Sequence, residues 1–265
     1  IIAIFKLSWC ITVMVNLGND EIVKYPFLTE AGKYLNDKGF SLEQFGSDPD
    51  LKKIVDNAFE RIITSSEGRI FKSDPSSNNS ALPLEIFSFL IAVILLKLSG
   101  MNTLIRRFSL AEARRAEKFL EKDLMNHQDA TKTKLSLQIL QELFSVTVEK
   151  TDETFTILVS DYLKHSINFH EREWKLINRR VTNGQVHLTP HETVRLVRKE
   201  LDRHIYTKIN SSSTPEMISG FETYVDKLKQ LAKKFEVKTV ESKEFPPCIK
   251  HAIEVLEKGE NLPHY

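Results

Sequence analysis

The stretch RVTNGQVHLTPHE, residues 180–192, holds two successive structural signals, and together they decide the fold class. The Asn-Gly pair at 183–184 supplies the positive φ values that a type I′ turn requires, so the sequence predicts a hairpin with strands over 174–181 and 185–188. The tetrapeptide TPHE at 189–192 then offers a capping residue, a proline at the first helical position and a glutamate at the third. The chain is therefore predicted to contain strands as well as helices.

The residues on both sides extend this signal into a small α/β module, which we predict over residues 146–209. Upstream, apolar residues alternate as in a half-buried strand; these are Val146, Val148, Phe155, Ile157 and Val159. Downstream, apolar residues recur every three or four positions, as on the buried face of a helix; these are Val194, Val197, Leu201 and Ile205.

Residues 14–145 carry helical signals instead. Asp48-Pro49 fits a helix cap followed by a proline at the first helical position, and apolar residues follow at helical spacing. A second apolar run, residues 82–98, is predicted to be a buried helix, and Ser109 with Glu112 fits a capping box. The predicted fold is mainly α with a small inserted α/β module (α+β), and its N-terminal domain is a helical, bundle-like one.

The two ends of the chain carry different signals. Residues 1–13 are apolar but fall short of the roughly 20 residues that a membrane span needs, and we expect an extension ahead of a natural start at Met14. Residues 210–238 are predicted to form a helix that returns to the helical domain. Residues 239–265 are predicted to form a linker and the first helix of a further, truncated domain. Neither apolar run predicts a membrane partner.

The charge of the chain is balanced overall but uneven along its length. The 265 residues carry a net charge of +1, so no global field singles out a nucleic acid or a membrane. Residues 164–208, however, contain ten Lys or Arg against five Asp or Glu, together with five histidines. This basic segment is a weak indication of a polyanionic partner.

The motifs of the common enzyme classes are absent from the sequence. It contains no GxGxxG or GxxxxGK[ST] loop, no GxSxG, no HExxH and no CxxC. The Asp-Pro-Asp triplet at 48–50 reads as a helix cap rather than as a magnesium-binding pair. Two cysteines, Cys10 and Cys248, cannot form a disulfide framework and suggest a reducing compartment.

Three features leave their role open on the residues alone. His187 and His191 could bind a metal together, or they could be exposed polar residues on a basic surface. Arg106 and Arg107 could contact phosphate, which guanidinium groups match in a bidentate manner, or they could belong to a solvated basic face. Cys248, in FPPCIK, could simply fill a core, as free cysteines often do.

Four stretches, read in order, resemble the large subunit of the archaeal and eukaryotic type of DNA primase, in its archaeal form. They are VKYPFL at 23–28, LIRRFSLAEA at 104–113, DYLKHSINFHEREWKLINRRVTNGQVHLTPHE at 161–192, and FPPCIK at 245–250 with EKGENLPHY at 257–265. The resemblance covers nearly everything from residue 21 onward. FPPC is its most specific motif.

The resemblance implies a set of site residues and a cofactor. In this family the large subunit docks onto the small catalytic subunit, helps primer initiation, and binds a [4Fe–4S] cluster through four cysteines of its C-terminal domain. Cys248 matches the first of those ligands, and Arg106 and Arg107 match a basic pair near the template–primer path. The other three cysteines do not occur before Tyr265, nor does the family's arginine expected soon after His264, so no cluster is expected in these 265 residues.

The expected function is that of a noncatalytic, regulatory subunit of a primase heterodimer in DNA replication. Its expected partners are the catalytic small subunit and the single-stranded DNA template with its primer, in the cytoplasm and associated with the nucleoid. One alternative is a helical protein–protein adaptor without a nucleic-acid role. Another is an autonomous iron–sulfur enzyme truncated at its cluster, which would need substrate-site residues that the sequence does not display.

Overall fold

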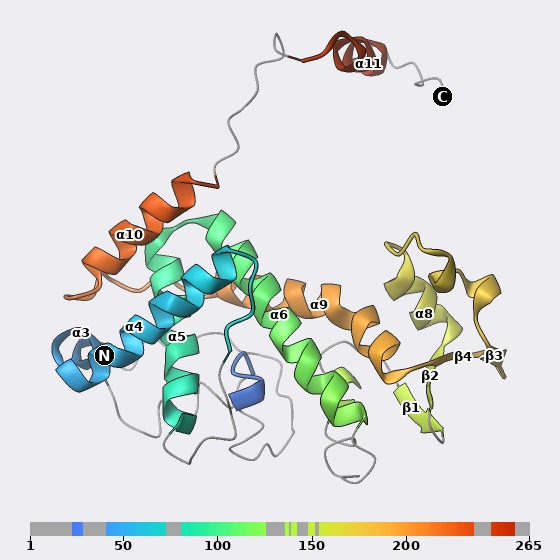
Figure 1. The fold of residues 1–265 in the computed structure, drawn as a ribbon, viewed down its shortest axis with the longest axis horizontal. Coiled ribbons are helices and arrows are strands. Elements are labelled where there is room, and N and C mark those ends of the chain that lie inside the picture. Colours follow the sequence, from blue (N-terminus) through green and yellow to red (C-terminus); the bar gives the residue numbers. More distant parts are fainter. Residues whose placement is uncertain are drawn as a thin grey trace.

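The computed structural model consists of a helical body, one small sheet and a separate C-terminal helix (Figure 1). It describes residues 23–28, 41–72, 81–125, 136–137, 139–141, 148–151, 154–235 and 245–257. The predicted extension over residues 1–13 and the predicted linker over residues 239–244 lie outside them. The predicted mainly α fold with a small α/β module is confirmed. The domain boundaries proposed from the sequence stay predictions.

The helical body begins with two helices whose starts are set by local chemistry. Helix α3 spans Leu42–Ser47 and α4 spans Pro49–Ser66. The predicted cap of α4 is confirmed, because the Asp48 carboxylate accepts a hydrogen bond from the amide of Asp50 at 2.9 Å, with Pro49 in the first turn. Helix α4 buries an apolar stripe of Ile54, Val55, Ala58 and Ile62.

Helices α5 (Ala81–Ser99) and α6 (Asn102–Met125) form the centre of the body. The capping box predicted at Ser109 is wrong, since α6 begins seven residues earlier and runs through this position. The buried side chains of Leu104, Ile105 and Phe108 favour the longer helix. Instead of capping, the Ser109 hydroxyl donates to the carbonyl of Arg106, as a serine inside a helix can, and to a carboxylate on another helix.

The α/β module contains a four-stranded antiparallel sheet in the order β1-β2-β4-β3. The strands are β1 (Val148–Thr151), β2 (Thr154–Leu158), β3 (Val181–Thr182) and β4 (Gln185–Leu188). The predicted turn is confirmed: Asn183 and Gly184 have φ values of 51° and 75°, and Val181 pairs with Val186. Helix α8 (Val159–Ser166) follows β2 directly, so Val159 starts a helix rather than extending the strand.

The first strand of the hairpin is shorter than predicted. Two 3-10 turns, η1 (Arg172–Trp174) and η2 (Leu176–Asn178), occupy half of the predicted strand. Trp174 is buried, its ring stacks on Phe169 at 4.3 Å between centroids, and its carbonyl accepts the hydroxyl of Tyr162 at 2.6 Å. These contacts turn the backbone inward, where a strand would have kept it in the sheet.

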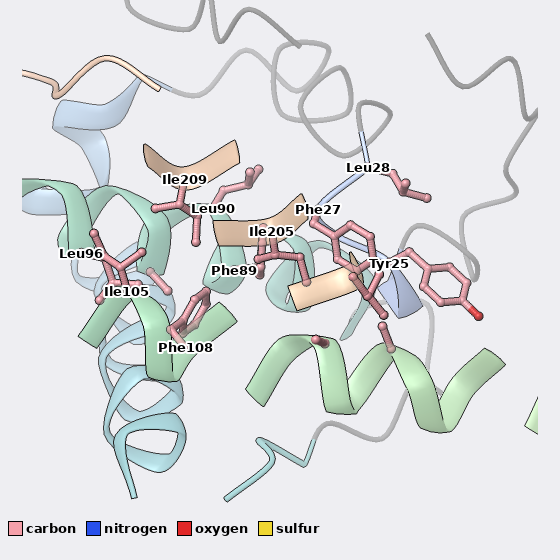
Figure 2. Close-up of a cluster of buried hydrophobic side chains, with 14 of the residues drawn as sticks. Tyr25, Phe27, Leu28, Phe89, Leu90, Leu96, Ile105, Phe108, Ile205 and Ile209 are labelled. Carbon is pink, nitrogen blue, oxygen red and sulfur yellow. The ribbon is translucent and has the colours of Figure 1, made fainter. Parts of the chain in front are cut away.

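Helix α9 (Pro190–Ser211) joins the module to the helical body. Thr189 and Glu192 form the predicted capping box at its start, which is confirmed. From the end of β4, α9 runs alongside α6 toward α5 (Figure 1). Its far end packs Ile205 and Ile209 into a cluster with Phe27, Phe89 and other buried apolar residues (Figure 2). Its 22 residues correspond to a length of about 33 Å.

Two further helices lie toward the C-terminal end of the described residues. Helix α10 (Glu222–Lys233) packs on α5 and buries Tyr224, Val225 and Leu228. Helix α11 (Pro247–Glu257) lies beyond the segment that follows residue 235 (Figure 1). No helix among the described residues combines the length and the apolarity that crossing a membrane requires.

Candidate nucleic-acid interface

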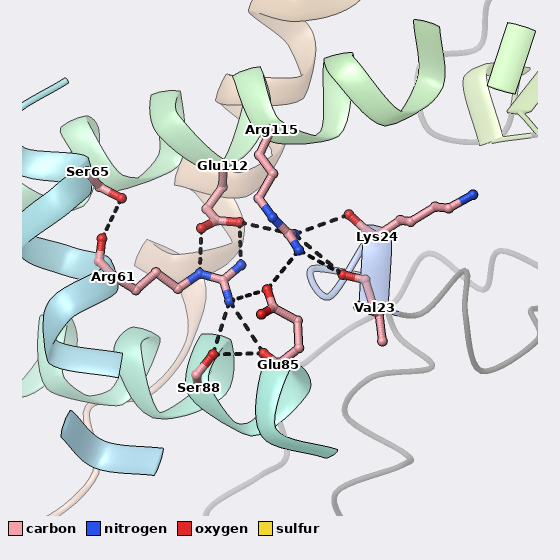
Figure 3. Close-up of polar contacts among 8 residues, drawn as sticks. All are labelled: Val23, Lys24, Arg61, Ser65, Glu85, Ser88, Glu112 and Arg115. Carbon is pink, nitrogen blue, oxygen red and sulfur yellow. Dashed lines mark hydrogen bonds and ion pairs between the residues drawn. The ribbon is translucent and has the colours of Figure 1, made fainter. Parts of the chain in front are cut away.

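A buried network of four charges holds α4, α5 and α6 together (Figure 3). The fully buried guanidinium of Arg61 donates to both carboxylate oxygens of Glu112, at 2.6 and 2.7 Å, and to Oε1 of Glu85 at 2.7 Å. Arg115 donates to the same Glu85 oxygen at 2.7 Å. Two cations and two carboxylates cancel, which is the condition under which buried charges are tolerated.

The electrostatics of this network follow from burial and pairing. Burial disfavours the charged form of Arg61, but Glu112 and Glu85 outweigh it and hold the pKa of Arg61 above its ordinary value. Burial, with repulsion from Arg61, lowers the pKa of Arg115. The Arg115 guanidinium also donates to the carbonyl of Val23, so the network anchors the 23–28 segment against α6.

Arg107 is tied into the helical body by two contacts. Its Nη1 donates to the carbonyl of Ser66, the last residue of α4, at 2.8 Å. Its guanidinium carbon lies 4.1 Å from the ring centroid of Phe235, which follows α10. The side chain therefore links the end of α4 to the end of α10, although it remains exposed at the surface.

Arg106 faces a different surface, because consecutive residues of a helix point about 100° apart. Its guanidinium carbon lies 5.5 Å above the ring of Tyr206 on α9. It lines an open cleft of about 590 Å³ between α6, α8 and α9. The structure therefore does not aim the two arginines at one site, and whether either contacts nucleic acid stays a prediction.

The cleft gathers cations that sequence reasoning did not single out. Lys164 on α8, with Lys199 and Arg203 on α9, lines it together with Arg106. Lys199 and Arg203 are four residues apart and so share a helix face, which is a signal visible in the sequence. The position of Lys164 and Arg106 opposite them depends on how α6 and α8 pack on α9, and no local pattern reveals that.

Cys248 lies in the first turn of α11 and is exposed, so it does not fill a core. The prolines at 246 and 247 precede it, and the helix begins at Pro247 as the FPPC motif predicts. A [4Fe–4S] cluster needs four thiolates, and Cys248 is the one cysteine in the described part of the chain. These residues alone do not fit a complete cluster.

The two histidines considered as metal ligands, His187 and His191, have separate partners. His187 lies within hydrogen-bonding distance of the hydroxyls of Thr154 and Thr182, at 3.3 and 3.2 Å. His191 pairs with Glu121 on α6 at 2.9 Å. Among the residues that the structure describes, no group of three or more His, Cys, Asp or Glu is arranged to hold a metal ion.

Comparison with known proteins places this mainly α protein with its inserted module in a family. No family model matches the chain. It is 30% identical over 256 residues to the DNA primase large subunit PriL of Methanosarcina acetivorans, covering 92% of this chain and 66% of that protein. It is 30% identical over 258 residues to PriL of Methanococcoides burtonii, covering 94% and 70%.

The chain belongs to the family of archaeal DNA primase large subunits. The PriL of Methanocella arvoryzae is a further relative, 28% identical over 248 residues, which are 91% of this chain. The chain spans 64% of the length of that relative. The resemblance stated from the four sequence stretches is thereby confirmed.

Proposed function

We propose that this chain is part of a noncatalytic primase subunit, which binds the catalytic small subunit and supports primer synthesis on single-stranded DNA. The observation that carries the proposal is the match to proteins named DNA primase large subunit over 91–94% of the chain. The match includes both the helical body and the α/β module. In the full-length protein, by this proposal, the subunit works in the cytoplasm at the nucleoid.

A noncatalytic role agrees with the way the described carboxylates are used. Nucleotidyl transfer by two metal ions needs neighbouring carboxylates that are free to bind the metals. Glu85 and Glu112 instead neutralise buried arginines, and Asp48 caps α4. Asp123 pairs with Lys24 at 2.9 Å. Each of these four acids has a structural partner.

A protein partner agrees with the exposed apolar side chains of the module. Leu163, Ile167 and Ile177 are 49%, 75% and 90% exposed, although large apolar residues favour burial. Leu163 lies on α8, Ile167 directly after α8, and Ile177 on η2. Ile167 and Ile177 belong to the basic segment 164–208. By this proposal the small subunit covers part of this surface.

The iron–sulfur cluster belongs to the longer protein. By this proposal Cys248 is one of four cysteine ligands there, and the first turn of α11 presents it. Partial positive charge at a helix N-terminus stabilises a thiolate, which is the form that binds iron.

The test is co-elution followed by a priming assay. The 265-residue chain and the small subunit, mixed at micromolar concentration, should elute together in size-exclusion chromatography. The chain alone should incorporate no labelled nucleotide with magnesium, while the mixture should prime on a single-stranded template. Separate elution would contradict the partner, and incorporation by the chain alone would contradict the noncatalytic role. Co-elution without any effect on priming would favour a protein-only adaptor.

A further inference from the structure

The cleft between α6, α8 and α9 is lined by cations from three separate helices. Arg106 comes from α6, Lys164 from α8, and Lys199 and Arg203 from α9. All four are exposed. Lys164 and Lys199 form no hydrogen bond or ion pair with the described part of the chain, so their charges are available to a ligand.

The cleft keeps a positive surplus after its own acids are counted. Glu200 and Asp202 also line it, against four cations. The carboxylate of Asp202 accepts a hydrogen bond from the Ser109 hydroxyl at 2.8 Å. Oε2 of Glu200 lies 3.6 Å from Nη1 of Arg203. His165 adds no charge near neutral pH, because burial lowers its pKa. An anion therefore gains more from the cleft than it loses.

The walls between the cations are apolar and aromatic. Leu110 on α6, Leu196 and Tyr206 on α9, and Ile167 just after α8 contribute them. The volume, about 590 Å³, lies within the range of sites that hold drug-sized molecules. Proteins that bind single-stranded nucleic acids combine two features. Cations line the path of the sugar–phosphate backbone, and apolar or aromatic side chains beside them stack against the bases.

Arg107 is separate from this cleft. It is not among the residues that line it, and its guanidinium contacts Ser66 and Phe235 on a different face of α6. The basic pair therefore contributes one side chain, not two, to the cationic surface.

We propose that this cleft binds the sugar–phosphate backbone of a single-stranded nucleic acid, with Arg106, Lys164, Lys199 and Arg203 contacting phosphates. The proposal deepens the proposed function by giving the template or primer a place on the α/β module's junction with the helical body. It rests on that function for its biological meaning. The binding itself is a property of the 265-residue chain and can be measured without the small subunit.

The experiment is a titration of fluorescein-labelled oligo-dT, 20 nucleotides long, followed by fluorescence anisotropy across a series of salt concentrations. Lys199→Ala should weaken binding roughly three-fold to ten-fold at low salt and should flatten the log–log salt dependence by about 0.7 per lost contact. Lys229→Ala is the matched control, since it removes the same charge from an exposed position on α10 and should leave both quantities unchanged.

A second variant tests whether a more positive cleft binds the oligonucleotide more tightly. Glu200→Gln removes an acid from the cleft without removing a cation, so it should tighten oligonucleotide binding and not weaken it. A cleft that only happens to be basic, with the nucleic acid bound elsewhere, would show no change with Glu200→Gln and equal losses for Lys199→Ala and Lys229→Ala. That result would overturn the proposal.

Each variant is also tested for co-elution with the small subunit, which separates the two proposals. Unchanged co-elution with weakened oligonucleotide binding supports the cleft. Loss of co-elution with unchanged oligonucleotide binding would make the cleft a docking surface for an acidic protein face and would overturn the proposal. If the parent chain does not co-elute but binds the oligonucleotide through Lys199, the proposed function fails and the cleft stands.

Discussion

Basic side chains have opposite roles in the interior of the helical body and in the cleft beside it. In the interior, Arg61 and Arg115 are buried and each contacts carboxylates within 2.7 Å. In the cleft, Arg106 and Lys199 are exposed and form no salt bridge with the described residues. The difference shows that the buried arginines are neutralised by acids from other helices, whereas the exposed basic side chains of the cleft keep their charge available to a ligand.

The largest effect should come from breaking the interior network. Glu112→Gln keeps the shape of the side chain but leaves Arg61 with one carboxylate that it must share with Arg115, so the free energy of unfolding should fall by about 3–5 kcal/mol. Urea denaturation measures it. Arg69→Ala, which breaks the exposed pair with Glu67, should change stability by less than about 1 kcal/mol.

A double variant sharpens this prediction. Arg61→Met with Glu112→Leu removes one cation and one carboxylate together, so the remaining pair of Arg115 and Glu85 stays neutral. Most of the stability lost in Glu112→Gln should return. If the double variant is as unstable as the single one, packing and not charge balance explains the loss.

The next effect is a pH dependence from a partly buried histidine. Burial, reinforced by Lys208, lowers the pKa of His204 to about 4, from 6.5. Because the unfolded chain takes up the proton more readily, the stability contributed by neutral His204 is fully present above pH 6.5. It is lost as pH falls toward 4, by roughly 3 kcal/mol. Between pH 7 and pH 4, the unfolding temperature should fall less in His204→Gln than in the parent chain. An equal fall in both proteins would assign the acid sensitivity to other groups.

A smaller effect should separate the two neighbouring arginines. Arg107→Ala removes the hydrogen bond to Ser66 and the contact with Phe235, and should cost about 1–2 kcal/mol of stability while leaving oligonucleotide affinity unchanged. Arg106→Ala should weaken oligonucleotide binding and leave the stability of the chain unchanged. Chemical denaturation and fluorescence anisotropy on both variants decide it, and equal effects of the two on affinity would contradict the division.

The smallest effect on this chain should come from Cys248. Its side chain is exposed in the first turn of α11, so Cys248→Ser should change stability by less than about 0.5 kcal/mol. In the full-length protein the same substitution should remove or degrade the cluster, because serine is a poor replacement for thiolate on iron. Iron content and visible absorbance measure this, and equal iron in both proteins would show that Cys248 is not a ligand.

Local chemistry explains what the sequence could predict of the fold. The Asn183-Gly184 turn and the caps at Asp48 and Thr189 depend on residues a few positions apart, and all three occur in the structure. The capping box at Ser109 failed because it competed with buried apolar residues on both sides of it. A capping-box motif inside a longer apolar pattern does not start a helix by itself.

The candidate site could be predicted only in part, because its geometry depends on distant partners. No local pattern marks Arg115 as buried, yet it pairs with Glu85, thirty positions away, inside the helical body. The contact of Arg107 with Phe235 joins two residues that are far apart in the sequence. The cleft needs α6 and α8 to pack on α9, and no spacing within a single segment specifies that.

The continuity of α9 has a mechanical consequence. The helix contains no glycine and no proline after its first residue, so it offers no ready point at which to kink. One end is capped at the sheet, and near the other end Lys208 bonds the carbonyl of Phe27. The helix should therefore move as one rigid unit. A displacement of the module is transmitted along it to the 23–28 segment and is not absorbed by a bend in between.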